Sequence, residues 1–321
     1  MTEGPTAPET VEESRLTVVL LAAAALVWTA AMIWSARVTI TGRASAEMEV
    51  TSTAYALPGA VSADLVAGAA VALLALTLLS GRRTVGATLR FAVATGAGLV
   101  VGLLSALPIV TINTAGSLYA IVGGTVAAAA TIGGAIAGFR IPPVIAAACT
   151  AAVAVFVVGF VLNLFQEPVL DLLGADDTAS SANAAQWFSY GQAAISGLTA
   201  GLVAYLMLRR FRRRTGGELR WPMYALAGAG PGLVMVIGEM LSRTAGSEVL
   251  ELAGRVSPLD QLAQQILSDA RLNSSLIILF LGAIAAIVAV GRTMKPAEEE
   301  DEEEEDQASS ESSETAYHSN S

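Results

Sequence analysis

"ATLRFAVATGAGLVVGLLSAL", residues 87–107, decides the fold class of this chain. It holds a single charged side chain, Arg90, and at 1.5 Å per helical residue its length is enough to cross about 30 Å of hydrocarbon. The whole chain of 321 residues is 54% hydrophobic and only 14% charged, and its mean hydropathy is +0.61. Seven further apolar stretches lie at residues 16–36, 63–79, 117–139, 142–165, 187–208, 222–241 and 272–290. The sequence therefore predicts an all-α polytopic membrane protein with eight transmembrane helices.

Basic residues gather beside every second connection between these stretches, whereas acidic residues predominate in the others. The basic positions are Arg82, Arg83, Arg90, Arg140, Arg209, Arg210, Arg212, Arg213, Arg214, Arg220, Arg292 and Lys295. Because basic residues near the ends of spans are retained in the cytoplasm, this bias predicts a plasma-membrane protein with both termini cytoplasmic.

The same arginines are candidates for more than topology. Arg82, Arg83, Arg212, Arg213 and Arg214 either anchor the helices or contact anionic lipid head groups or a cytoplasmic partner. Nucleic acid is not expected as a partner, because the basic loops are short and tethered to the bilayer.

The two strongest basic connections also share an order of residue types. "RTVGATLRF" at residues 83–91 is matched by "RTGGELRW" at 214–221, and "GAGLV" at 96–100 by "GAGPGLV" at 228–234. Arg15 and Arg140 open the first and fifth stretches, and Ser117 and Ser275 open the fourth and eighth. This predicts a parallel repeat of four plus four helices, residues 16–139 and 140–292, between acidic disordered ends at 1–15 and 293–321.

Proline inside the seventh stretch marks a candidate site. Pro231 removes a helix hydrogen bond and its glycine neighbours favour bending, so this stretch is predicted to be kinked or broken. The kink is either structural or the lining of a solute path, because discontinuous helices at matching places in two repeats mark such paths. The candidate path residues are Gly228, Gly230, Pro231 and Gly232, with Gly96 and Gly98 at the matching place.

Few ionisable residues fall inside the stretches. Glu239 and Arg243 are spaced for an ion pair near the outer boundary, which is either a structural pair or an outer gate. Asp64 is expected near the end of a span that begins at residue 63. The only histidine is His318 and the only cysteine is Cys149, so we expect no enzyme, no cofactor and no metal site. A phosphate-binding loop of the P-loop type is also missing, so the chain would not hydrolyse ATP by that route.

The connections and the tail give three further expectations. β-Branched residues and a Pro-Gly pair predict a short hairpin within residues 37–59. Residues 257–271 predict an amphipathic helix in the loop 244–271, with Leu259, Leu262 and Ile266 as the apolar face that lies on the outer surface or caps the bundle. Nine consecutive acidic residues at 298–306 predict a tail that is only solvating or that tethers a basic partner.

Two functions remain open. The leading interpretation is a permease-like protein, homo-oligomeric or monomeric, that binds or moves a small or amphipathic solute without its own ATPase. The scarcity of charge inside the spans argues against an ion-driven pump. The alternative is a non-catalytic envelope-assembly or membrane scaffold protein that acts through its outer loops and acidic tail.

Overall fold

The computed structural model describes residues 7–42, 46–80, 86–113, 117–173, 178–215, 219–248, 251 and 258–293, and these residues are helical almost throughout, without a strand. The helices are α1 (Ala7–Thr41), α2 (Ala46–Ser80), α3 (Ala87–Val110), α4 (Ser117–Ala137), α5 (Pro142–Leu164), α6 (Gln166–Leu172), α7 (Thr178–Thr215), α8 (Trp221–Thr244) and α10 (Pro258–Gly291). In the described part of the chain, eight of them are long and apolar enough to cross a membrane. The predicted class of an eight-helix, multi-pass membrane protein is therefore confirmed.

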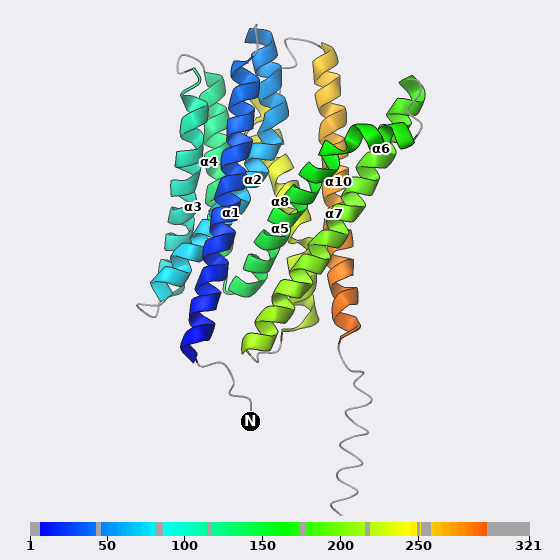
Figure 1. Ribbon diagram of the computed structural model, residues 1–321. Helices are drawn as coiled ribbons and strands as arrows, with labels where there is room; N and C mark the ends of the chain where they lie inside the picture. The colour runs from blue at the N-terminus through cyan, green and yellow to red at the C-terminus, as the bar shows by residue number, and fades with distance from the viewer. Residues whose placement is uncertain are drawn as a thin grey trace, which may run out of the picture.

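The long helices run side by side through the molecule, and α1 begins at the same end at which α10 finishes (Figure 1). The helix α1 begins at Ala7, before the predicted start at residue 16. Short α6, which was not predicted, crosses the top of α7 in the view of Figure 1.

The predicted hairpin within residues 37–59 is wrong. α1 continues to Thr41, and α2 begins at Ala46 and runs unbroken through Pro58 and Gly59. In a membrane the backbone must satisfy its own hydrogen bonds, so β-branched residues that favour strands in water remain helical here. Proline is tolerated for a related reason, because neighbouring groups satisfy the carbonyl that it leaves free.

A single helix also replaces the predicted surface helix and eighth span. α10 runs from Pro258 to Gly291, so Ser275 lies inside it rather than opening a span. The side chains of Leu259, Leu262 and Ile266 are exposed, whereas Gln264 is buried. In this segment the apolar side chains therefore point away from the bundle, as expected for a helix that meets lipid, whereas Gln264 points inward.

The helices form two groups with the same arrangement of neighbours. In the first group α4 packs on α2 and α3, and α1 packs on α2; in the second α10 packs on α7 and α8, and α5 packs on α7. A close glycine contact joins α3 to α4 at Gly98 and Gly134, and another joins α8 to α10 at Gly228 and Gly282. Glycine permits such contacts because helices in lipid associate through close backbone packing. The most extensive contact between the groups is that of α2 with α8.

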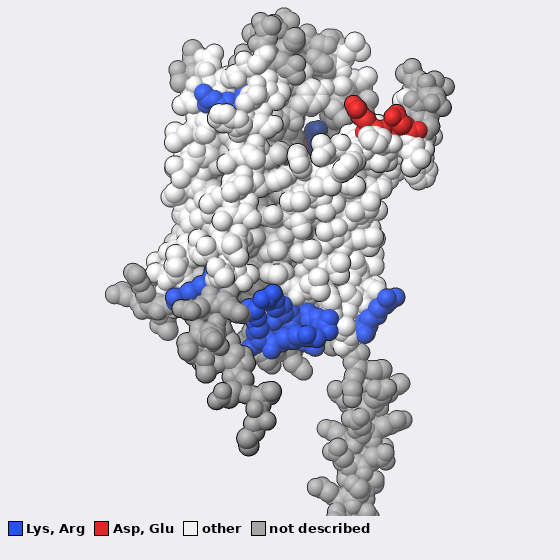
Figure 2. Space-filling view, viewed as in Figure 1, with Lys and Arg blue, Asp and Glu red and all other residues white. Residues whose placement is uncertain are grey.

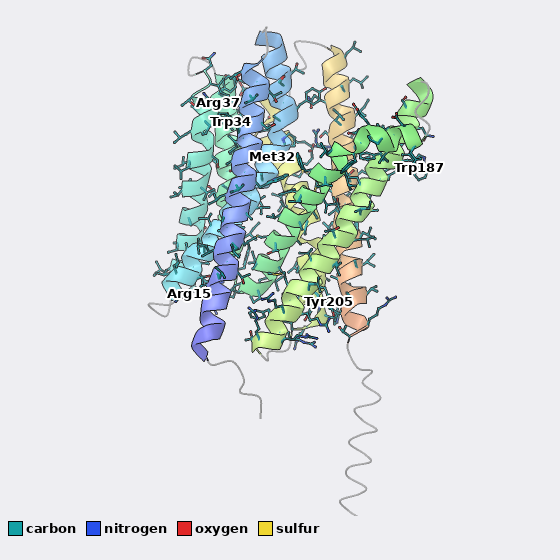
Figure 3. All side chains as sticks on the ribbon, in the orientation of Figure 1. Arg15, Met32, Trp34, Arg37, Trp187 and Tyr205 are labelled. Atoms are coloured by element: carbon teal, nitrogen blue, oxygen red, sulfur yellow. The ribbon has the colours of Figure 1, made fainter. Side chains whose placement is uncertain are left out.

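Charge distinguishes the two ends of the bundle. We call the end that carries the last turn of α7, with Arg212, Arg213 and Arg214, the basic end. Basic side chains gather at this end in Figure 2, whereas acidic side chains lie over α6 at the opposite end. At the opposite end Trp34 and Trp187 point outward near Arg37 and α6 respectively (Figure 3). Exposed tryptophans at this level are typical of the boundary between hydrocarbon and water.

Candidate functional site

A cluster of polar side chains lies between α8 and α10 towards the opposite end. We call the five residues Glu239, Arg243, Gln264, Ser268 and Arg271 the polar cluster. Glu239 and Arg243 are one turn apart on α8, and Gln264, Ser268 and Arg271 follow one face of α10 at spacings of four and three. The close packing of α8 against α10 brings the two sets together.

Glu239 is the centre of the cluster, and its side chain is only 3% exposed. The Arg243 Nε donates to Glu239 Oε1 at 3.3 Å, and the Arg271 Nε donates to Glu239 Oε2 at 3.0 Å. The Ser268 hydroxyl also donates to Glu239 Oε1. A buried charge is stable only when it is paired and hydrogen-bonded, and two guanidinium groups and a hydroxyl supply both conditions here.

The two arginines are more accessible than the glutamate they bind. Their side chains are 33% and 32% exposed for Arg243 and Arg271 respectively. Arg243 has a second ion pair, in which its Nη2 donates to Asp269 Oδ1 at 3.0 Å, and the Asp269 side chain is 77% exposed. Two acidic and two basic groups therefore balance in charge, and both arginine side chains remain partly exposed.

Gln264 adds an unsatisfied amide to the same face of α10. It is 5% exposed, and neither its Nε2 nor its Oε1 has a hydrogen-bond partner among the described residues. An unpaired buried amide is costly, and most buried polar groups in proteins have a partner. One turn from Ser268, this amide offers one donor group and one acceptor to a water molecule or a solute.

The polar cluster lies next to the contact between the two helix groups. Gly238, the residue before Glu239, packs against Ser62 of α2, where a Cβ would lie 2.3 Å from the Ser62 Oγ. Near the opposite end, the surface has a hollow between the region of α1 and α2 and the region of α5 and α6 (Figure 2). A basic side chain is visible deep inside this hollow. Apart from Arg37, the described basic residues in this half of the bundle are Arg243 and Arg271. The centre of the cluster is therefore buried in the bundle, while its two arginines are about one third exposed.

Sequence reasoning found two of the five cluster residues. The spacing of Glu239 and Arg243 predicted their ion pair, and the structure contains it. Gln264, Ser268 and Arg271 were missed because residues 257–271 were assigned to a surface helix. The three polar side chains at helical spacing, opposite an apolar face, were the available signal for an inward polar stripe.

The glycines of the seventh stretch make helix contacts. α8 continues through Pro231, and a Cβ on Gly228 would lie 2.3 Å from the carbonyl oxygen of Gly282. Gly230 faces Ala148 of α5, and a Cβ on Gly232 would lie 2.3 Å from the backbone nitrogen of Leu279. These contacts account for the glycines as packing residues, and the solute path along them stays a prediction.

The matching segment in the third stretch is divided between two environments. A Cβ on Gly98 would lie 2.4 Å from the Ala130 carbonyl oxygen of α4, whereas Gly96 is exposed with nothing within 4 Å. Gly98 thus packs within the first helix group, and the glycines of α8 pack on α5 and α10 in the second. The structure does not bring the two glycine segments together around one site.

The basic candidates can be placed only in part. Arg82 and Arg83 lie outside the described residues. Arg213 and Arg214 are exposed and Arg212 is half-buried at the end of α7, in the basic patch of Figure 2. Their contacts with anionic lipid or a partner stay predictions.

Asp64 was placed at the end of a span by the sequence, and this placement is wrong. The membrane-spanning part of α2 runs from Thr51 to Ser80, so Asp64 lies 13 residues after its start and 16 before its end. Its side chain is 0% exposed. The sequence prediction began the span too late because the residues before Asp64 are mildly polar. They lowered the mean hydropathy of every sequence window that included them.

Comparisons of the chain with protein-family models, with curated proteins and with solved structures find no match. In the residues that the structure describes, no three His, Cys, Asp or Glu side chains gather to hold a metal ion.

Proposed function

We propose that the chain is a permease-like membrane protein that binds, and then moves, an amphipathic solute with an anionic group, without an ATPase of its own. In this proposal the basic end and both termini lie in the cytoplasm, as the distribution of Arg and Lys favours. The polar cluster then lies towards the outer side of the plasma membrane, and the solute reaches it through the hollow.

One observation carries the proposal: two partly exposed guanidinium groups share one buried carboxylate beside the contact between the helix groups. A carboxylate or phosphate of a solute can compete with Glu239 for these donors, because guanidinium binds both kinds of anion through paired hydrogen bonds. The unpaired amide of Gln264 offers a further polar contact. Transporters with internal repeats bind their solutes at the contact between repeats, and this cluster lies in the second helix group next to the contact of Gly238 with Ser62 of the first group.

An amphipathic solute fits the surroundings better than a fully polar one. The helices beside the cluster carry few charged side chains, and the segment of α10 that includes Leu262 and Ile266 exposes apolar side chains towards lipid. A solute with an apolar tail can reach the hollow from within the bilayer and place its charged group on the arginines. The scaffold alternative rests on residues 293–321 and on the outer loops, of which the larger part lies outside the described residues.

The proposal is tested by binding of two amphiphiles of equal chain length to the full chain in lipid nanodiscs. Dodecyl phosphate is the anionic probe, dodecyltrimethylammonium is the cationic control, and empty nanodiscs give the background. We expect saturable binding of the phosphate alone. Because a hydrogen bond to a charged group contributes about 1.5–3 kcal/mol, Arg271→Gln should weaken this binding about tenfold or more.

Two further variants separate binding from folding. Arg271→Lys keeps a positive charge and should restore part of the affinity, whereas Arg292→Gln, at the basic end, should bind as the unaltered chain does. Equal binding of the two probes, or unchanged phosphate binding by Arg271→Gln and Arg243→Gln, would contradict the proposal. Uptake of dodecyl phosphate into proteoliposomes then distinguishes movement from binding alone.

A further inference from the structure

Asp64 is a buried acidic group that the polar cluster does not use. It lies in the middle of the membrane-spanning part of α2 with its side chain 0% exposed. Neither carboxyl oxygen has a hydrogen-bond partner among the described residues. The Ser105 hydroxyl of α3 is a polar group beside this carboxyl group.

None of the charged side chains described on the helices around α2 forms an ion pair with Asp64. These helices are α1, α3, α4, α5 and α8, and the structure has no ion pair between Asp64 and any described side chain on them. Glu239 and Arg243 of α8 are bound within the polar cluster, and Arg37 of α1 donates to the Pro108 carbonyl oxygen and to Thr111. Among the residues of these helices whose side chains the structure describes, the remaining charged and titratable groups are Arg15 at the basic end of α1, Arg90 near the basic end of α3, Tyr119 of α4, Cys149 of α5 and Tyr224 of α8.

We propose that Asp64 is a proton-binding site: it is a neutral carboxylic acid in this closely packed arrangement and releases its proton when α2 and α3 separate. An ionised carboxylate that has no counterion among the described side chains, and only one hydroxyl group beside it, is too costly inside a bilayer, so the packed state selects the protonated form. Loss of the proton then favours an arrangement that admits water to Asp64. Ionisable residues that face a bundle interior are typical of proton relays in membrane carriers.

The groups around Asp64 are better suited to bind a proton than a metal ion. Hard cations such as Ca²⁺ need six or more oxygen ligands. Asp64 and Ser105 supply three side-chain oxygens, and the nearby carbonyl group of Ala63 accepts a hydrogen bond from Thr29 at 3.1 Å. A proton needs only the carboxyl group itself.

The polarity of α2 indicates the side from which the proton exchanges. Towards the opposite end, Ser52, Thr53 and Ser62 are buried polar residues on the same helix. Towards the basic end, residues 65–76 are apolar without exception. Proline interrupts the hydrogen bonding of α2 at Pro58 and of α3 at Pro108, both on the opposite-end side of Asp64. Water therefore has a more polar and less regular route from the opposite end.

Infrared spectroscopy of the full chain in lipid tests protonation directly. At neutral pH we expect a carboxylic C=O band in the unaltered chain and in Glu239→Gln, because Glu239 is ion-paired with Arg243 and Arg271 and is not the source of the band. The band should disappear in Asp64→Asn and persist at a shifted position in Asp64→Glu. If the carboxylic C=O region of the spectrum is identical for the unaltered chain and Asp64→Asn at neutral pH, Asp64 is ionised and the proposal is overturned.

A chemical probe and a one-sided pH change complete the test. Dicyclohexylcarbodiimide adds to a protonated carboxyl group in apolar surroundings, so the peptide with Asp64 should gain the mass of one carbodiimide, and Asp64→Asn should gain none. In vesicles with one known orientation, the infrared band should respond to alkaline buffer on the side of the opposite end. A response only to the side of the basic end would overturn the assigned route. Neither measurement depends on transport, so Asp64 can be protonated even if dodecyl phosphate does not bind.

Discussion

Replacing Glu239 by glutamine tests how much the polar cluster stabilises the packing of α8 on α10. The substitution keeps the shape of the side chain but removes the charge that binds Arg243 at 3.3 Å and Arg271 at 3.0 Å. Breaking a fully buried ion pair costs about 3–5 kcal/mol. Here both arginines are about one third exposed and can be hydrated in the variant. We therefore expect the free energy of unfolding to fall by about 2–3 kcal/mol, below the range for fully buried pairs.

Asp269→Asn is the matched control. It removes one carboxylate that also pairs with Arg243, at 3.0 Å, but the Asp269 side chain is 77% exposed. Exposed ion pairs contribute about 0–1 kcal/mol, so this variant should remain close to the unaltered chain in stability. The two substitutions are the same in chemical type and differ mainly in burial.

The assay is reversible unfolding in mixed micelles with a rising fraction of sodium dodecyl sulfate, followed by helical circular dichroism. A change of 2–3 kcal/mol corresponds to a change of about 30- to 150-fold in the equilibrium constant at one detergent composition. If Glu239→Gln shifts the transition no further than Asp269→Asn, the cluster does not stabilise this packing, and our reasoning from burial is refuted.

Three further predictions concern packing, hydrogen bonding and topology. Gly133→Ala should lower the thermal unfolding midpoint, because the new Cβ would lie 1.9 Å from the backbone carbonyl oxygen of Leu65. Gly96→Ala is the control and should be neutral or stabilising, because no atom lies within 4 Å of the position of its Cβ. Thr29→Val removes a hydrogen bond of 3.1 Å between α1 and α2 and should cost only about 0.6 kcal/mol in the same detergent titration, since such bonds contribute little in membranes. In a background without the native cysteine, Leu172→Cys should react with an impermeant maleimide outside intact cells, and Thr215→Cys only after lysis; the reverse pattern would contradict the assigned orientation.

The sequence predicted the number of spans well because transfer into lipid depends mainly on composition and length. All eight predicted stretches lie within their observed helices almost completely, although 63–79 covers little more than half of the span Thr51–Ser80. The errors concern the segments near the opposite end. Glutamates and threonines before Pro58 resembled a loop, although the bilayer favours a helix for any chain that enters it.

The candidate site was harder to predict, because it depends on which helices meet. The pair of Glu239 and Arg243 follows from local spacing within one helix. Arg271, however, lies 32 residues after Glu239 in the sequence and binds the same carboxylate from another helix. Burial of Asp64 depends on its neighbours on α1, α3 and α4 as well as on the true start of α2. No property of the sequence around these residues specifies such contacts.

The two proposed sites lie on either side of one helix contact. Ser62 of α2 packs on Gly238 of α8, Glu239 is the next residue on α8, and Asp64 is two residues further along α2. Two residues correspond to a rotation of about 200° around a helix, so Asp64 points away from α8 and towards α3. A movement of α2 that admits water to Asp64 would therefore also alter the contact beside Glu239. If both proposals hold, protonation of Asp64 in the first helix group would bias the proposed solute site in the second, without a direct contact between the two carboxyl groups. It also explains how a chain with so little intramembrane charge could still use a proton: one acid in the first group and one balanced cluster in the second suffice when a single helix contact connects them.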